Sequence, residues 1–557
     1  MTGTRPGARP PYGGTMAGPS RTPGRRQAAM SEIDAPTIPA ALDRAARDFP
    51  HVEAVVDGPV RLTFGELRDR VRTVARAFAA LGVGRGDPVA IWAPNGVRWV
   101  LTALGALGAG AVLVPLNTRY KGDEARWPLA RSGAGVLFVE DGFLGNGYLA
   151  MLGAGTGEES AQAPGVPGLP ALRTVITYDE AEGPGVIGWT RFLEGVHAVP
   201  EDEARSRWSS VTGDDVADVL FTSGTTGRSK GVMCTHAQDV RTYEAWCDRT
   251  GLRRGDRYLV VNPFFHCFGY KAGILACLLR GATMVLQKVF DAGETMRLVE
   301  AERITVLPGP PTVYVSLLDA PGRDRHDLSS LRLAVTGAAV VPIELVRRLR
   351  FELFPQVVTA YGLTEACGTV TSCSVGDDDA TVAATSGRPI DGVEVAVVDG
   401  RGEPVPPGED GEILVRGHNV MKGYLGDEEA TAAAVRDGWL ATGDRGRLDA
   451  RGHLTVTGRS TDMFTVGGFN VYPAEVEHVL AGHEAVAEAV VVGIPDRRLG
   501  EVGRAYVRAR PGAAATPEDL IAHCRSRLAG FKVPREVVFV ADLPRNAAGK
   551  VVRSRLP

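Results

Sequence analysis

The chain has 557 residues, of which 44% are hydrophobic and 23% charged, and its formal net charge is -4. This length exceeds one ordinary core, so we expect two or more folding units, and the slight negative charge argues against a nucleic-acid partner. No apolar run reaches the roughly 18–20 residues that span a bilayer. The 7 cysteines are odd in number and lack a C-x-x-C pair, which disfavours a zinc site and favours the reducing cytoplasm.

The N-terminal segment, residues 1–36, is rich in Pro, Gly and Arg and has no acidic residue before Glu32. Such a composition cannot bury enough apolar surface to fold on its own. We therefore expect this segment to be disordered, or to extend a protein whose true start is Met16 or Met30.

Segments of helix and strand character alternate from Leu42 onwards. An apolar stripe at Leu67, Val71, Val74, Ala75 and Phe78 predicts a helix over residues 64–81. A strand, a helix and a further strand are predicted over residues 89–92, 97–109 and 111–116. This alternation predicts parallel sheets covered by helices. Residues 142–203, with several prolines and glycines, read as a variable loop region.

A second alternation covers residues 258–363, and from about Thr381 the pattern changes to short β runs typical of a small barrel-like subdomain. After Arg459 a compact unit follows, with a helix over 475–480 and a strand over 487–492. The predicted fold class is α/β: a large N-terminal domain (37–458) of packed parallel sheets, helices and a small β-barrel-like subdomain, then a small mobile α+β C-terminal domain (459–557).

The most informative motif follows the apolar run Val219-Leu220-Phe221. A loop of small and hydroxylated residues leaves backbone N–H groups uncovered, and together with one lysine it suits a polyphosphate. The candidate phosphate ligands are Thr222, Ser223, Gly224, Thr225, Thr226, Gly227 and Lys230. The spacing is not that of a Walker A loop, because Lys230 follows Ser229 and precedes Gly231. A Gly-rich turn between two strands is the alternative.

Further motifs suit the other parts of a nucleotide-activated carboxylate. Small residues at Gly337-Ala338-Ala339 would let an adenine lie flat on the backbone. Tyr361-Gly362-Leu363-Thr364-Glu365 offers a flat ring, a flexible glycine and a carboxylate for a magnesium ion. Asp444 after Thr442-Gly443 is a bidentate acceptor for ribose hydroxyls, and Arg459 after Gly458 offers a guanidinium. Lys550 ends the segment Leu543-Pro544-Arg545-Asn546-Ala547-Ala548-Gly549-Lys550.

Together and in this order, the motifs resemble those of the adenylate-forming superfamily, which holds acyl-CoA synthetases, firefly luciferase and the adenylation domains of peptide synthetases. The likeness runs from about Leu62 to the C-terminus and fits the acyl-CoA synthetase branch best. Asn262-Pro263-Phe264-Phe265-His266-Cys267-Phe268-Gly269-Tyr270-Lys271 and Leu307-Pro308-Gly309-Pro310-Pro311-Thr312 are similar to a narrower group. That group is the actinobacterial ligases that load CoA onto the indanedione-propionate fragment of steroid rings.

The resemblance implies a two-step reaction with ATP and CoA as co-substrates and Mg²⁺ as cofactor. In the family pattern, Thr222 and Glu365 hold the metal, Asp444 and Arg459 contact the ribose, and Lys550 approaches the substrate carboxylate and the α-phosphate. His266 would help to shape the acyl pocket, with Tyr270, Lys271, Val335 and Gly362 as looser candidates for its walls. Gly467, Gly468 and Phe469 would line the pantetheine tunnel. The hinge position is Thr461 here, where the family usually has Asp or Lys.

Several functions remain open at this point. The acid is expected to be bulky and apolar, such as a steroid-derived propionate, and a medium- or long-chain fatty acid is the alternative. A stand-alone adenylation enzyme for amino or aryl acids is disfavoured, because no Asp lies in residues 262–266 and no carrier domain follows. A luciferase-like oxygenase and a non-catalytic nucleotide-binding protein are further alternatives. The expected partners are the acid, ATP and CoA, and a homodimer is compatible with the sequence.

Overall fold

The computed structural model describes residues 35–153, 166, 168–222, 229–337, 341–459, 463–510, 512–544 and 553–557. The expected disordered segment therefore lies outside the described residues, apart from Ala35 and Pro36. Among the described helices, none is both long enough and apolar enough to cross a membrane.

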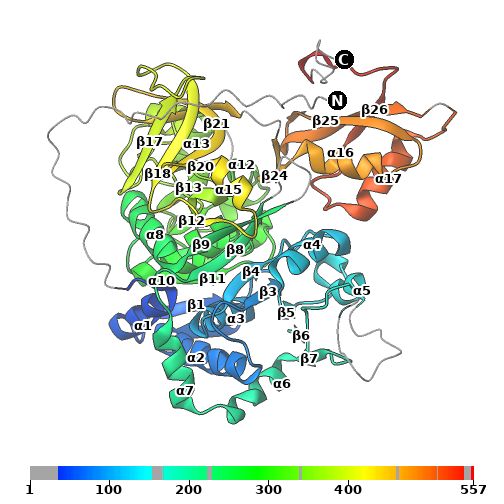
Figure 1. The fold of residues 1–557 in the computed structure, drawn as a ribbon. Helices are drawn as coiled ribbons and strands as arrows, with labels where there is room; N and C mark the ends of the chain where they lie inside the picture. Colours follow the sequence, from blue (N-terminus) through cyan, green and yellow to red (C-terminus); the bar gives the residue numbers. More distant parts are fainter. Residues whose placement is uncertain are drawn as a thin grey trace, which may run out of the picture.

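Two large, mainly parallel sheets build the N-terminal part (Figure 1). One has the strand order β16-β15-β14-β13-β12-β10-β11-β1-β2 and the other β19-β9-β8-β4-β3-β5-β6-β7. The strands of the first sheet are β1 (Glu53–Asp57), β2 (Val60–Thr63), β10 (Arg257–Val260), β11 (Thr283–Leu286), β12 (Val306–Pro308), β13 (Leu333–Gly337), β14 (Gln356–Tyr361), β15 (Thr371–Ser372) and β16 (Arg388–Pro389). Those of the second are β3 (Pro88–Trp92), β4 (Val112–Pro115), β5 (Val136–Val139), β6 (Thr174–Thr177), β7 (Val186–Gly188), β8 (Val216–Thr222), β9 (Lys230–Thr235) and β19 (Gly423–Tyr424).

Helices cover these sheets, as the alternating pattern predicted. The ones used below are α2 (Phe64–Ala80), α3 (Val97–Gly108), α4 (Gly122–Ser132), α8 (His236–Thr250) and α12 (Pro311–Leu318). Helix α2 begins at a capping box, in which Thr63 and Glu66 satisfy each other's backbone N–H groups. All five residues of its predicted apolar stripe are buried.

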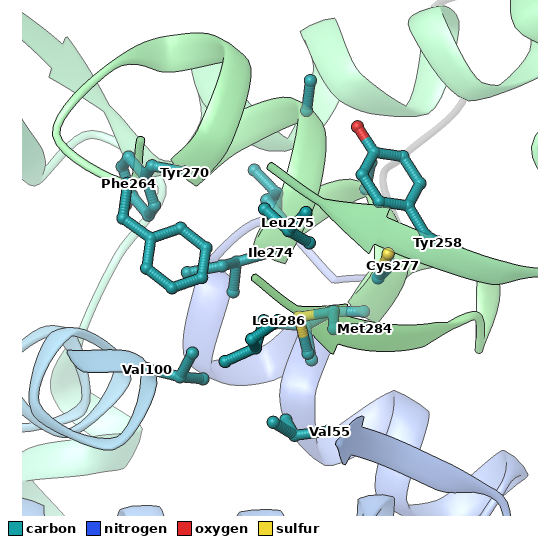
Figure 2. Close-up of a cluster of buried hydrophobic side chains, with 14 of the residues drawn as sticks. Val55, Val100, Tyr258, Phe264, Tyr270, Ile274, Leu275, Cys277, Met284 and Leu286 are labelled. Atoms are coloured by element: carbon teal, nitrogen blue, oxygen red, sulfur yellow. The ribbon is translucent and has the colours of Figure 1, made fainter. Parts of the chain in front are cut away.

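The largest hydrophobic core takes side chains from both sheets and from α2, α3 and α8. Figure 2 shows part of it, where Val55 of β1, Val100 of α3 and Met284 of β11 converge with Phe264 and Tyr270. The segment with the steroid-ligase likeness therefore contributes directly to the core. Its residues Tyr270–Leu275 form a π-helical turn.

The expectation of a loop region over residues 142–203 is wrong for its described part. It contains α5 (Tyr148–Leu152), β6, β7, α6 (Trp189–Glu194) and α7 (Glu201–Ser210). Strands β6 and β7 pair in parallel beside β5 and so extend the second sheet. Each has only three or four residues and lies between stretches rich in Gly and Pro, so it shows too little periodicity to be recognised.

The smaller sheet comes next in the chain, where short β runs were predicted, and its strands pair antiparallel. Its strands are β17 (Val393–Val398), β18 (Gly411–Gly417), β20 (Val435–Arg436), β21 (Trp439–Leu448) and β22 (Leu454–Arg459). It packs its own apolar cluster, which includes Val415, Leu440 and Leu454. With the two large sheets, it bears out the predicted α/β architecture of the N-terminal part.

The C-terminal unit has a mixed sheet with helices on one face. Its elements are β23 (Phe464–Val466), β24 (Phe469–Val471), α16 (Pro473–Ala481), β25 (Val486–Asp496), β26 (Gly500–Ala509), α17 (Pro517–Arg527) and β27 (Glu536–Phe539). Val491 and Val507 pack under both helices. Val490 and Tyr506 point to the opposite face, where they contact Leu543 and Leu556. In Figure 1, α16 and α17 lie on the side of α4, and the C-terminus lies away from the large domain.

A lysine is buried in the large domain between two carboxylates. Lys271 Nζ lies 2.6 Å from Asp239 Oδ1 and 3.1 Å from Asp218 Oδ1, and all three side chains are 0% exposed. The sequence suggested Lys271 as a wall of the acyl pocket. This is wrong, because the ammonium group is buried and paired with carboxylates of the protein itself. Burial and the neighbouring Asp239 raise the pKa of Asp218 well above its usual value. One ammonium can fully balance only one carboxylate, and the raised pKa favours the protonated form of Asp218.

This charge balance makes two neighbouring substitutions unequal. Lys271→Met should lower the free energy of unfolding of the large domain by about 3–5 kcal/mol, because it leaves Asp239 buried without its cation. Asp218→Asn replaces a carboxyl whose raised pKa favours its neutral form and should cost less than about 1 kcal/mol. Calorimetric unfolding of both variants beside the wild type measures the difference. An equal loss in both variants would contradict the assigned charge states.

Candidate active site

The predicted phosphate loop connects two strands that form a hairpin. β8 and β9 are antiparallel, and Thr222 at the end of β8 is the register partner of Lys230 at the start of β9. The strand pairing therefore fixes both ends of the loop. From the neighbouring helix α4, Trp127 Nε1 donates to the carbonyl of Ser229 at 2.8 Å. Ser223, Gly224, Thr225, Thr226 and Gly227 lie outside the described residues.

Glu365 lies in a chain of contacts with the lysine of this hairpin. It belongs to a short helical turn, Thr364–Ala366, which is separated from the end of β14 by Gly362 and Leu363. Tyr424 donates its hydroxyl to Glu365 Oε1 at 3.1 Å, and Lys230 Nζ lies 4.8 Å from the Tyr424 ring centroid. Burial raises the pKa of Glu365, with Asp444 adding to this effect and Lys230 opposing it. A nearby cation would therefore be stabilised by this carboxylate.

The predicted adenine and ribose motifs meet at the end of the first large sheet. Tyr361, the last residue of β14, donates its hydroxyl to Asp444 Oδ2 at 2.6 Å, and both side chains are buried. Asp444 lies on β21, opposite Arg459 of β22 in the strand register. The structure thus joins two motifs that are 83 residues apart. Hydrogen bonding fixes the carboxylate next to the aromatic ring.

Two glycines of these motifs are required by close backbone contacts. A Cβ at Gly337, the last residue of β13, would lie 2.6 Å from the carbonyl oxygen of Ala360. A Cβ at Gly362 would lie 2.2 Å from the carbonyl oxygen of Gly368. Each position excludes a larger residue because backbone atoms cannot move aside easily. Ala338 and Ala339 lie outside the described residues.

His266 lies at the start of a helical turn, Cys267–Gly269, where its Nδ1 accepts a hydrogen bond from the Phe268 N–H at 3.1 Å. The surrounding protein lowers the pKa of His266 to about 4, so the ring is neutral at pH 7. Solvent nevertheless reaches the side chain. The ring is therefore packed against protein on one side and open to solvent on the other. Since Nδ1 is an acceptor, Nε2 carries the proton.

The looser pocket-wall candidates are not gathered around His266. Tyr270 and Val335 are fully buried in the main core, and Lys271 belongs to the buried ion cluster. Of the four, only Gly362 is exposed. Tyr270, Lys271 and Val335 are surrounded by apolar residues in the sequence, so the pattern did not show which of these side chains face the core. The sequence therefore predicted the strand and helix segments here better than the direction of their side chains.

The Gly467-Gly468 turn of the C-terminal unit contacts the large domain. The turn joins β23 to β24 with positive φ angles of 57° and 88°, which favour glycine. A Cβ at Gly468 would lie 3.3 Å from Cβ and Cγ of Pro310, at the start of α12. Phe469 stacks on Phe531 of its own unit, and its ring centroid lies 6.5 Å from that of Phe265, next to His266. The turn therefore lies beside Pro310 and close to Phe265, the neighbour of His266.

Other predicted residues cannot be placed, and some relevant ones were not predicted. Thr461 and Lys550 lie outside the described residues, and Arg459 is described only through its backbone pairing. Tyr424, Trp127 and Phe265 all contact candidate site residues. None lies in a motif with its own chemical signature. The aromatic pair in Pro263-Phe264-Phe265-His266 was the one available signal.

Comparison with known proteins identifies the family. Residues 42–425 match the model of the AMP-binding enzyme, and residues 475–550 match that of the AMP-binding enzyme C-terminal domain. A methyl-dioxo-octahydroindenyl propanoyl:CoA ligase of Rhodococcus jostii is 51% identical over 93% of this chain and 98% of its own length. Its namesake from Mycobacterium tuberculosis is 51% identical over 94% of this chain and 99% of its own length.

A solved relative, the o-succinylbenzoate CoA synthetase of Bacillus subtilis, gives a comparison in two bound states. Its double mutant with the product analogue OSB-NCoA has a TM-score of 0.75 at 28% identity, over 93% of this chain and 98% of that chain. Its complex with the acyl-adenylate OSB-AMP has a TM-score of 0.60 at 28% identity, over 92% and 97%. This chain is thus more similar to the form with the CoA analogue. It belongs to the AMP-binding enzyme family, in its acyl-CoA synthetase branch, as its motifs indicated.

Proposed function

We propose that this protein is an ATP-dependent, AMP-forming acid–CoA ligase that acts on a bicyclic keto acid with a propionate side chain. The substrate carboxylate attacks the α-phosphate of ATP and expels pyrophosphate, and the CoA thiol then attacks the acyl carbon and expels AMP. The observation that carries the proposal is the high identity with two such ligases over more than nine tenths of each chain. A fatty acid is the alternative substrate class.

The adenylation half-reaction joins two anions, so charge neutralisation and positioning must dominate it. The hairpin loop from Thr222 to Lys230 would hold the β- and γ-phosphates. The adenine would lie between Gly337-Ala338-Ala339 and the Tyr361 ring, with Gly362, Leu363 and Thr364 completing the wall. Asp444 and Arg459 would bind the ribose. In support, the strand register places Asp444 opposite Arg459, and Tyr361 bonds Asp444 directly.

The donor set also fits a magnesium ion. Thr222 and Glu365 offer a hydroxyl and a carboxylate, which are hard oxygen ligands of the kind that Mg²⁺ prefers. Burial is the main cause of the raised pKa of Glu365, and a bound cation would offset it by stabilising the charged form. Bound there, the ion would neutralise phosphate charge. The protein residues then orient the nucleotide, and Lys550 would bring a cation to the substrate carboxylate and the α-phosphate.

The thioester half-reaction would take place where the Gly467-Gly468 turn of the C-terminal unit contacts the large domain. Gly468 and Phe469 lie beside Pro310 and Phe265, where a pantetheine arm would reach His266. The greater likeness to the relative that holds a CoA analogue supports this assignment of the observed orientation. His266 would act there as a neutral wall residue that can donate from Nε2. We place the reaction in the cytoplasm, where ATP, CoA and reduced cysteines occur together; all seven cysteines are free and buried.

The acid specificity is the first test. The wild type should convert the bicyclic propionate with a kcat/KM at least a hundredfold above that for acetate, equal to about 2.7 kcal/mol of transition-state preference. Glu365→Gln keeps an acceptor for Tyr424 but removes the charge, so it is the control that should lose activity on every acid alike. A hundredfold preference for acetate or for an amino acid would refute the substrate assignment. A preference for a medium- or long-chain fatty acid would support the alternative.

The route of the oxygen atoms tests the chemistry independently of the acid. With heavy oxygen in both carboxylate positions, one labelled atom should appear in AMP, because the acyl carbon–oxygen bond breaks when the thiol attacks. Mass spectrometry of the nucleotide after a single turnover measures this transfer. Formation of ADP, or AMP without the label, would show that no acyl-adenylate forms.

A further inference from the structure

A buried ion cluster crosses from the large domain to the C-terminal unit, outside the residues assigned to either half-reaction. Lys532 follows α17, and its Nζ lies 2.7 Å from Glu124 Oε1 in the first turn of α4. The same Nζ lies 2.6 Å from Glu475 Oε1 in the first turn of α16. The side chains of Lys532 and Glu124 are only 3% and 8% exposed. The Tyr120 ring, 5.0 Å from Nζ, closes another side.

These groups depend on each other for their charges. Burial opposes the charge of Lys532, but Glu475 and Glu124 outweigh it and raise the pKa of the lysine. Burial also raises the pKa of Glu124, although Lys532 opposes this. A buried pair of this kind costs much more to break on one side than an exposed pair does. Glu124 also accepts from the Lys121 N–H at 2.9 Å, so its side chain is fixed on α4.

The two carboxylates differ in what happens when the C-terminal unit turns. Glu475 belongs to the same unit as Lys532, so their contact moves with the unit. Glu124 belongs to the large domain, so its contact exists only in the observed orientation. Leu543 and Leu556, on either side of residues 545–552, pack on the sheet face opposite α16 and α17. Presenting that face to the site would require a turn that separates Lys532 from Glu124.

We propose that Glu124 and Lys532 are positioning residues that hold the C-terminal unit in the orientation in which the Gly468 turn lies beside Pro310, and so serve thioester formation alone. The proposal rests on the proposed function, because it assumes two half-reactions at one site. Neither residue contacts the residues assigned to the nucleotide or the acid in the described part of the chain. Their effect is on the population of one orientation.

Two half-reaction assays test this role. In Glu124→Gln and Lys532→Met, conversion of supplied acyl-adenylate and CoA to thioester should fall by about tenfold or more, since a buried partner is lost. ATP–pyrophosphate exchange without CoA should stay within about twofold of wild type or rise, because the competing orientation is weakened. Arg525→Met removes an exposed cation from the same unit and is the matched control. It should change neither half-reaction.

A double variant distinguishes the loss of the Glu124–Lys532 contact from a general destabilisation of the protein. Glu124→Gln combined with Lys532→Met should make thioester no more slowly than the worse single variant, because the contact between the two units is already lost in each single variant. Calorimetry should show the C-terminal unit still folded in each variant. Equal losses in both half-reactions, or simple additivity of the two substitutions, would overturn the proposal.

A distance measurement tests the same pair without catalysis. Spin labels on Asp202→Cys in α7 and Ala514→Cys before α17 report the separation of the two units, and the native cysteines are all buried. Without substrate, the wild type should show one dominant distance, and Lys532→Met should broaden the distribution. Identical distributions would refute the positioning role. If the wild type made no CoA thioester from any acid, the proposed function would fail while this measurement still judged the ion pair.

Discussion

In the observed orientation, the contact between the Gly467-Gly468 turn and Pro310 places the C-terminal unit against the large domain. The turn needs glycine twice, first for its positive φ angles and then because a side chain at Gly468 would meet the ring of Pro310. This close approach places a loop of the C-terminal unit next to Phe265 and His266 of the large domain. Of the residues assigned to the nucleotide, Tyr361 lies on β14 and Asp444 on β21, and neither strand includes this turn. In the proposed mechanism, the C-terminal unit changes its orientation while these strands keep their positions.

The buried charges also differ according to whether they lie within one unit or between the two units. Lys271 is enclosed with its two aspartates inside the large domain, where its charge can only stabilise the fold. Lys532 is equally buried, but one of its partners belongs to each unit. Glu365, by contrast, has a pKa raised by burial and accepts a hydrogen bond from the Tyr424 hydroxyl, and a bound cation would stabilise its charged form. The surroundings of the three groups thus match three different roles. Lys271 stabilises the fold, Lys532 has the proposed positioning role, and Glu365 has the proposed role in binding magnesium.

Local sequence predicted those parts of the molecule in which one short segment determines its own structure. The stripe of α2, the strand before the phosphate loop and the turn at Gly467 follow from periodicity, an apolar run or glycine chemistry. The sequence could not predict contacts between distant segments. Tyr361 reaches Asp444 across 83 residues and Lys532 reaches Glu124 across 408, with no local pattern to mark either pair. Lys271 was misassigned for the same reason, since its partners lie on β8 and α8.

The central claim is that one site carries out two half-reactions with different parts of the C-terminal unit. Comparing Lys550→Ala with Gly468→Trp in both half-reactions tests it most directly. Lys550→Ala should lower pyrophosphate release by about 10²- to 10³-fold, as for loss of one preorganised charge contact, yet still convert supplied acyl-adenylate and CoA to thioester. Gly468→Trp should form the adenylate and fail to transfer it, because the indole would fill the pantetheine path beside Pro310. Equal impairment of both half-reactions in both variants would contradict the claim.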